Sequence, residues 1–269
     1  MQYNFKFGDK YLLAPKINYG GIYSVLVAGY YSQFLNSLED DEVVLDGGAN
    51  IGAFTLAASS IADQVIAVEP NPENFRYLVH NIRLNKMKNV IPINAALSDF
   101  NGVTKFIGEG ESGHISFNGI NVPSITIDTL ESRFNVTFDG IKLDIEGAEP
   151  MALLGGGKET LTHAKRLVYE LDERQWFIIK NGSNPSYSTL NNYLKGLGYA
   201  LTQYEPDIEK WRLLKENLFF KKVKIGDIII NEFRNNFWFE YETLKNMFSS
   251  RNSNNLPNYN FMMVYGCRI

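Results

Sequence analysis

Short apolar runs separated by helical patterns recur along the middle of the chain. Five of these runs are rich in β-branched residues and have the length of a buried strand: 43–45, 65–68, 90–93, 141–145 and 167–169. Strands that alternate with helices form βαβ units, and such units build a parallel sheet with helices on its faces. The pattern therefore predicts an α/β fold with a doubly wound, mostly parallel sheet.

The clearest helical pattern follows the run at 65–68. Asn71 can cap a helix and Pro72 suits the first helical position. Apolar residues then recur at helical spacing at Phe75, Leu78, Val79 and Ile82. An amphipathic helix with its apolar stripe on the sheet is expected here.

The segments between and before these units break the pattern. Glycines punctuate residues 96–140 at Gly102, Gly108, Gly110 and Gly113, which predicts an inserted hairpin or irregular strands on the substrate side. Residues 22–35 are apolar and follow Tyr19-Gly20-Gly21, which predicts a hinge and then a helix that could cover a ligand.

The end of the chain differs in composition from the rest. After a predicted late strand at 218–222 it is rich in asparagine and aromatic residues, and Phe237, Tyr241, Leu244 and Phe248 fall on one helical face. We divide the chain into an α/β domain at 1–224, with a helical cap at 1–40 and a core at 41–224, and an aromatic extension at 225–269 packed on the core. The extension could also form a lid or a homodimer contact.

Composition narrows the class of protein. The 269 residues are 45% hydrophobic, carry a net charge of −4 and include one cysteine, Cys267. An acidic chain is not expected to offer an extensive nucleic-acid surface, and a single cysteine excludes an internal disulfide. No run has the length of a membrane span and no signal peptide is recognised, so a soluble cytoplasmic protein is expected.

A glycine turn at 46–52 (DGGANIG) joins the first apolar run to a helix start. Glycines allow positive φ angles and close approach of a ligand to the backbone, and the helix start presents free N–H groups. Glu69, at the end of the next run, can accept hydrogen bonds from both ribose hydroxyls. The turn and this carboxylate together predict a nucleoside cofactor, in preference to a turn that only permits tight packing.

Two nucleoside cofactors are compatible with this turn. Residues 47–52 nearly match the dinucleotide fingerprint, but Ala49 stands where the second glycine should admit a pyrophosphate. Asp46 would repel a pyrophosphate and suits a cofactor that carries an ammonium and a sulfonium group. S-adenosylmethionine is therefore preferred over NAD.

Several ordered motifs resemble the FkbM family of methyltransferases. They are 46–52, 69–75 (EPNPENF), 81–85 (NIRLN), 95–99 (AALSD) and 141–149 (IKLDIEGAE), and the resemblance covers about residues 41–172. It implies a class I, Rossmann-like methyltransferase fold, S-adenosylmethionine as methyl donor, and O-methylation of a sugar or another hydroxylated natural product. The two ends of the chain are not covered by the resemblance, so it leaves the acceptor open.

The resemblance also assigns cofactor-binding residues. Asp46, Gly47, Gly48, Asn50 and Gly52 would hold the methionine part, and Glu69 with Asn71 would lie at the ribose. Ser98 and Asp99 would lie beside the adenine, where Asp99 could accept the adenine amino hydrogen; a local turn is the equal alternative for this aspartate.

Candidate catalytic residues follow the fourth apolar run. Asp144 and Glu146 end it, at the carboxyl edge where such sheets bind ligands, and residues two apart on a strand share a face. Methyl transfer to a hydroxyl requires positioning and removal of its proton, which a carboxylate can accept. Asp144 is expected to touch the cofactor too, and Lys142 either faces the other side or pairs with one of the carboxylates.

Two further possibilities concern a metal and a histidine. Glu170 and Asp172 follow the next run and would lie near Asp144, so the acidic residues could bind a divalent cation; a solvated acidic rim is preferred because no histidine joins them. His114 lies in the glycine-punctuated insertion and has a side chain suited to proton exchange, so it is a third candidate base.

Three functions are compared. Methyl transfer from S-adenosylmethionine to a hydroxyl of a small or glycosylated acceptor is preferred. An NAD-dependent oxidoreductase rests on the near match at 47–52, and a binding module that keeps the cofactor pocket without turnover is the third. No nucleophile elbow or Walker loop competes with them.

Overall fold

The structure is a computed structural model, and it describes residues 2–7, 10–15, 22, 25, 30–110, 112–171, 186–204, 218–225, 228–235 and 262–268. Of the predicted helix at 22–35, the described part includes Ile22 and Val25 in helical conformation and the short helix α2 (Ser32–Asn36). The helical face predicted between Phe237 and Phe248 lies outside the described residues, so the predicted lid or homodimer contact stays a prediction.

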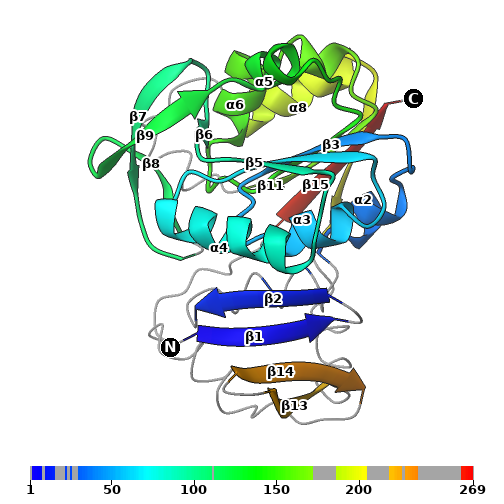
Figure 1. Cartoon of the computed structure of the whole chain (residues 1–269). Helices are drawn as coiled ribbons and strands as arrows, with labels where there is room; N and C mark the ends of the chain where they lie inside the picture. The colour runs from blue at the N-terminus through cyan, green and yellow to red at the C-terminus, as the bar shows by residue number, and fades with distance from the viewer. Residues whose placement is uncertain are drawn as a thin grey trace, which may run out of the picture.

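A seven-stranded sheet forms the centre of the molecule (Figure 1), in the order β12-β15-β11-β10-β3-β4-β5. Five strands run parallel to one another: β5 (Val90–Ile93), β4 (Gln64–Val68), β3 (Val43–Gly47), β10 (Gly140–Leu143) and β11 (Arg166–Leu171). All five predicted runs are therefore confirmed as strands. Beyond β11 lies β15 (Met262–Arg268), and the edge strand is β12 (Tyr199–Tyr204). β15 is antiparallel to both of its neighbours, β11 and β12.

Helices cover both faces of this sheet (Figure 1). On one face lie α2, α3 (Ala53–Ala58) and α4 (Pro72–Leu84); on the other lie α5 (Ile127–Phe134), α6 (Glu149–Gly156) and α8 (Tyr187–Gly196), and a short 3-10 helix, η2 (Thr160–Thr162), follows α6. Each face has its own apolar core, one including Leu143 and Leu153 and the other Val44 and Phe54. The predicted doubly wound α/β fold is confirmed, and it is the class I, Rossmann-like arrangement.

The predicted amphipathic helix is α4, and its cap is the expected one. The side chain of Asn71 accepts hydrogen bonds from the backbone N–H groups of Glu73 and Asn74, at 2.9 and 3.4 Å. Pro72 is the first helical residue, where its missing N–H has no partner to lose. Leu78 and Ile82 are buried in the core on this face of the sheet.

The predicted insertion is a small sheet of its own. It contains β6 (Ala96–Leu97), β7 (Gly102–Ile107), β8 (His114–Ser116) and β9 (Ile120–Ile125), in the order β6-β9-β7-β8. Phe106 and Val122 pack with Ala96, and Ile115 packs against them and against the main core. The insertion is thus attached to the domain through one face of its sheet.

The start of the chain differs from the predicted helical cap. Before α2, residues 2–15 form two strands, β1 (Gln2–Phe7) and β2 (Lys10–Pro15), in a second small sheet with β13 (Leu218–Ile225) and β14 (Ile228–Asn235). The strand β2 pairs with β1 on one edge, and side chains of α4 bond its other edge. Asn81 on α4 accepts from the backbone N–H of Leu13 at 2.7 Å and donates to its carbonyl at 3.0 Å, and Asn85 does the same for Tyr11. Two asparagines one helical turn apart therefore dock this sheet beneath α4 (Figure 1).

The predicted division at residue 225 is also corrected. The late strand predicted at 218–222 exists as part of β13, but it belongs to the small sheet and not to the core. The last strand of the predicted extension, β15, lies inside the central sheet between β11 and β12. The final residues are part of the core because they supply the backbone hydrogen bonds that join these two strands. No helix among the described residues is long and apolar enough to cross a membrane.

Candidate active site at the carboxyl edge of the sheet

Four neighbouring parallel strands end in one row. The register aligns their last paired residues, which are Tyr169, Leu143, Gly47 and Val68. The next residue of each strand therefore lies at the same edge of the sheet, and these residues are Glu170, Asp144, Gly48 and Glu69. The row brings together the glycine turn, the predicted ribose carboxylate and two acidic residues from distant parts of the sequence.

The middle of this row is the point at which the strand order reverses. From β3 the chain continues to β4 and β5 on one side, and it later returns to β10 and β11 on the other. Open α/β sheets bind ligands outside the carboxyl ends of the strands at such a switch point. Gly48 and Asp144 lie on its two sides, so the topology places the candidate site between the glycine turn and the loop after β10.

Glycine is required in the turn by close backbone approach. Gly48 has a φ of +72°, and a Cβ atom there would lie 1.8 Å from the carbonyl oxygen of Asp144. Gly52 has a φ of +97° and caps the start of α3, and Asn50 also adopts a left-handed conformation, with a φ of 53°. The turn therefore depends on two glycines, as the sequence predicts, and one of them touches the loop that carries Asp144.

The Asp46 carboxylate is engaged inside the protein, and its predicted contact with a cationic cofactor stays a prediction. It is fully buried, accepts a hydrogen bond from the Thr55 hydroxyl at 2.5 Å and forms an ion pair with Lys142 at 3.0 Å. The two residues are register partners on β3 and β10, so their side chains lie on the same face of the sheet. The observed ion pair of Lys142 is with Asp46, and not with Asp144 or Glu146 as the second of its two predicted placements had it.

Lys142 also holds the glycine turn. Its Nζ donates to the carbonyl oxygens of Gly47 and Gly48 at 3.2 and 2.9 Å, and it lies 5.5 Å from the ring centroids of Tyr31 and Phe54. Burial lowers the pKa of Lys142, but the negative charge of Asp46 and its other acidic neighbours outweighs burial, and the net pKa is raised. The buried ammonium group therefore stays charged. It donates to three oxygen atoms, one on the Asp46 carboxylate and two on the backbone of the turn, and so fixes the turn.

Glu69 is a buried carboxyl group at the end of β4. Its Oε2 accepts the backbone N–H of Asn50 and its Oε1 that of Asn71, both at 2.8 Å. Burial raises the pKa of Glu69 to about 7, against the opposing effect of these two N–H groups. The residue thus links the glycine turn to the start of α4, and it lies where the sequence predicts a ribose partner.

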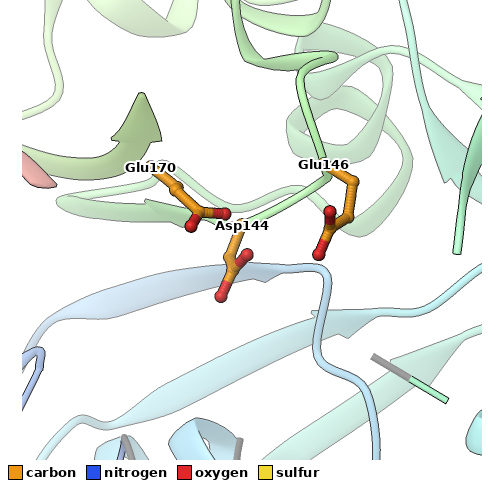
Figure 2. Close-up of side chains that lie close together, drawn as sticks. All are labelled: Asp144, Glu146 and Glu170. Carbon is orange, nitrogen blue, oxygen red and sulfur yellow. The ribbon is translucent and has the colours of Figure 1, made fainter. Parts of the chain in front are cut away.

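Three carboxyl groups gather beyond β10 and β11 (Figure 2). Asp144, Glu146 and Glu170 each offer an oxygen within 4.8 Å of the others, and Asp144 lies between the other two. The predicted strand at 141–145 ends at Leu143, so Asp144 and Glu146 are not on one strand face. They meet because the backbone turns after Asp144 and Glu146 takes a left-handed φ of 55°.

Tyr31 joins this cluster from the N-terminal side, a contact that no sequence signal indicates. Its hydroxyl donates to Oδ2 of Asp144 at 2.6 Å, and the side chain is buried against Phe54. Burial raises the pKa of Glu170 well above its usual range, and the charge of Asp144 adds to the effect. A proton held by Glu170 relieves the repulsion between the two carboxyl groups.

The cluster offers ligands that a hard divalent cation prefers. Among the described residues no histidine or cysteine joins it. Asp172, the fourth predicted member, lies outside the described residues. The preference for an acidic rim over a metal site stays a prediction.

The remaining predicted site residues lie elsewhere. His114 pairs with Ile107 on β7, on the face of the small sheet opposite to Phe106 and Ile115, which pack toward the core. It is not a member of the carboxylate cluster that the described residues form. His114 is therefore not placed beside the other two candidate bases.

Ser98 and Asp99 pack against the end of α6. The backbone N–H of Ser98 donates to Ile125 on β9, and Cβ atoms added at Gly156 and Gly155 would lie 2.2 Å from Ser98 and Asp99. The buried Ser98 donates its hydroxyl to Asp99 at 3.1 Å. Their predicted role at the adenine stays a prediction, and Asn71 has a definite structural task as the cap of α4.

A second buried glutamate makes stability depend on pH. Glu149 starts α6, is fully buried, accepts the backbone N–H of Ile145 at 2.8 Å and the hydroxyl of Tyr187, and burial raises its pKa from 4.5 to about 7. A carboxyl with a raised pKa contributes its full stabilisation below the unfolded pKa of 4.5, and this contribution is lost as the pH rises from there through about 7. At about 1.4 kcal/mol for each pKa unit, the loss is roughly 3 kcal/mol.

We therefore expect the free energy of unfolding to fall between about pH 4.5 and pH 7, and to fall less in Glu149→Gln, which cannot ionise. Urea unfolding at several pH values measures the slope. Glu159→Gln, at an exposed position nearby, should leave the slope as it is in the unmodified protein. An equal slope in Glu149→Gln would contradict the assignment.

Comparison with known proteins now bears on the site. The family profile described as the methyltransferase FkbM domain matches residues 46–201, which is more than half of the 269 residues. The chain belongs to the FkbM methyltransferase family. The matched range begins at Asp46 and includes the glycine turn, Glu69 and the whole carboxylate cluster.

Two curated relatives of the chain differ in the substrate that their names give, a hexuronic acid or a tRNA. Hexuronic acid methyltransferase AglP of Haloferax volcanii is 32% identical over 127 residues, covering 45% of this chain and 52% of AglP. The tRNA (guanine(37)-N(1))-methyltransferase Trm5b of Pyrococcus abyssi is 42% identical over 114 residues, covering 42% of this chain and 31% of Trm5b. The chain thus spans about half of AglP and a third of Trm5b.

A solved structure of an FkbM methyltransferase from Methylobacillus flagellatus is also similar. It has a TM-score of 0.46 and 19% identity, and the match covers 72% of this chain and 53% of that one.

Proposed function

We propose that the chain transfers a methyl group from S-adenosylmethionine to a hydroxyl group of a sugar or another small acceptor. The observation that carries the proposal is the row at the carboxyl edge, where Gly48, Glu69 and Asp144 lie side by side at the switch point of a family member's sheet. Family membership supports the methyl transfer, and the carboxylate at the edge supports an acceptor that must lose a proton.

The residues in the row fit this cofactor. An ionised carboxylate has about four acceptor sites, so Glu69 can accept ribose hydroxyl groups beyond its two backbone partners. Gly48 has no side chain to obstruct a ligand that approaches the turn. Asn50 and Gly52 complete the turn around the start of α3, and the negative cluster at Asp144 suits a ligand that bears positive charge.

When bound, S-adenosylmethionine supplies a methyl group activated by its sulfonium. The task left to the protein is to orient the acceptor hydroxyl and accept its proton. Asp144 is the base we assign, because its carboxylate is half-exposed at the switch point and the buried Tyr31 hydroxyl holds its orientation. Burial and the charge of Asp144 raise the pKa of Glu170, which favours its neutral form and lowers the negative charge beside Asp144.

The acceptor is assigned by chemistry. The name of AglP says that its substrate is a hexuronic acid. This favours a sugar acceptor over other hydroxyl compounds. A tRNA acceptor is the second candidate, because Trm5b matches a comparable part of this chain. The net charge of −4 and the acidic cluster beside the turn weigh against a polyanion.

Two measurements test the proposal. Calorimetry should detect binding of S-adenosylmethionine, and Glu69→Ala should weaken it because the ribose loses its acceptor. Methyl-labelled cofactor incubated with a sugar and glycoside panel, and separately with total tRNA, should label the first set only. Label in tRNA would overturn the small-acceptor assignment, and binding without transfer to any fraction would favour a cofactor-binding module.

A further inference from the structure

The β7–β8 loop spans residues 108–113, of which the structure describes 108–110 and 112–113, and asparagine side chains attach its described part to the first turn of α4. Nδ2 of Asn74 donates to the carbonyl oxygen of Gly110 at 2.7 Å. Nδ2 of Asn71 lies 3.5 Å from the carbonyl oxygen of Gly108, at the limit of a hydrogen bond. The insertion is therefore tied to the helix that follows Glu69, at a point far from its own connections to the core.

Asn74 is in contact with Glu69 as well. Its side chain hydrogen-bonds the Glu69 carboxyl group, and it is 4% exposed, as is Glu69 itself. A primary amide has two N–H donors on one rigid nitrogen. Once one donor is directed at Glu69 and the other at Gly110, the position of the loop depends on the position of the carboxylate.

The loop has a backbone shape that transmits this contact. Gly108 and Gly110 both adopt positive φ angles, of 116° and 61°. A Cβ atom at Gly108 would lie 2.6 Å from the Cα atom of Gly113, so the two ends of the loop are packed together. The contact of Asn71 at Gly108 therefore lies where the two ends of the loop meet, and the contact of Asn74 holds Gly110 between them.

We propose that Asn74 is a positioning residue that couples occupancy of the cofactor site at Glu69 to docking of the β7–β8 loop. The coupling rests on the proposed function, because it requires a ribose at Glu69. Hydroxyl groups that donate to Glu69 favour its ionised form, and an ionised acceptor binds the Asn74 amide more strongly. The amide is then held in the orientation that donates to Gly110, and the loop docks more firmly when the cofactor is present.

The effect must be reciprocal. If a bound cofactor stabilises the docked loop, the docked loop raises cofactor affinity by the same factor, which for coupled sites is about 5- to 150-fold.

Hydrogen exchange with S-adenosylhomocysteine tests the coupling without turnover. In the unmodified protein, we expect saturating ligand to slow amide exchange in residues 108–113. In Asn74→Ala, this slowing should disappear, and the dissociation constant measured by calorimetry should rise by roughly fivefold or more. Asn89→Ala removes an asparagine that donates to the carbonyls of Ser59 and Ala62, away from Glu69, and should preserve both effects.

The outcomes separate the coupling from the function on which it rests. If the ligand binds the unmodified protein without slowing exchange in the loop, the coupling is wrong and the cofactor assignment stands. If the slowing persists in Asn74→Ala, another contact carries it and Asn74 has no such role. If the ligand does not bind the unmodified protein at all, the proposed function fails and the coupling fails with it. Asn74→Gln, which keeps the amide, is a second variant should Asn74→Ala not fold.

Discussion

Lys142→Met is expected to destabilise the protein by about 3–5 kcal/mol, the usual cost of leaving one member of a buried ion pair without its partner. Asp46 is fully buried, and in the variant the Thr55 hydroxyl would be its remaining side-chain hydrogen bond among those observed. A domain of ordinary stability has about 5–15 kcal/mol to lose, so the effect should be large. Urea unfolding followed by circular dichroism measures it.

The double variant Asp46→Asn with Lys142→Met distinguishes two effects of Lys142. One is neutralisation of the buried Asp46 charge, and the other is the hold on the glycine turn. The double variant removes the uncompensated charge, so much of the lost stability should return. Cofactor affinity should stay low, because the carbonyl groups of Gly47 and Gly48 still lack the ammonium that holds the turn. If the double variant binds S-adenosylmethionine as well as the unmodified protein does, Lys142 serves only to neutralise Asp46.

Asp144→Asn is expected to lower kcat for methyl transfer by about 10²–10⁴-fold, the usual contribution of a general base. The amide is similar in size to the carboxylate and can still accept the Tyr31 hydroxyl, but it cannot take up a proton at neutral pH. Binding of S-adenosylmethionine should persist. Single-turnover transfer from labelled cofactor, with calorimetry on the same preparation, measures both quantities.

Glu146→Gln is the matched control, since it removes a neighbouring carboxylate of the same cluster. It should lower kcat much less than Asp144→Asn if Asp144 accepts the proton. A larger loss in Glu146→Gln would move the base to Glu146, and a large loss in His114→Ala would place the insertion's histidine at the acceptor despite its position on the outer face of the small sheet.

Local patterns were sufficient to predict the parallel strands and the cofactor edge. The five apolar runs became strands because each is short, apolar and bounded by turn residues, and the helix after β4 was readable from Asn71 and Pro72. Glu69 and Gly48 followed from the same reasoning, since the carboxyl ends of parallel strands share one edge. These features depend on residues close together in the sequence.

Other features depend on residues brought together only by folding. The strand register places Lys142 opposite Asp46, and register is not visible in either strand alone. Likewise Tyr31 reaches Asp144 from 113 residues away, and β15 enters the sheet from the end of the chain.

The sequence by itself therefore determined the doubly wound core, the glycine turn and the family, because periodicity, caps and turn glycines act over a few residues. Tertiary structure alone decided the partners of the polar and charged groups: Lys142 with Asp46, Tyr31 with Asp144, and Asn74 with Gly110. The reason is that a buried polar group must be satisfied by whichever donor or acceptor the packing brings within reach, and several were available at each position.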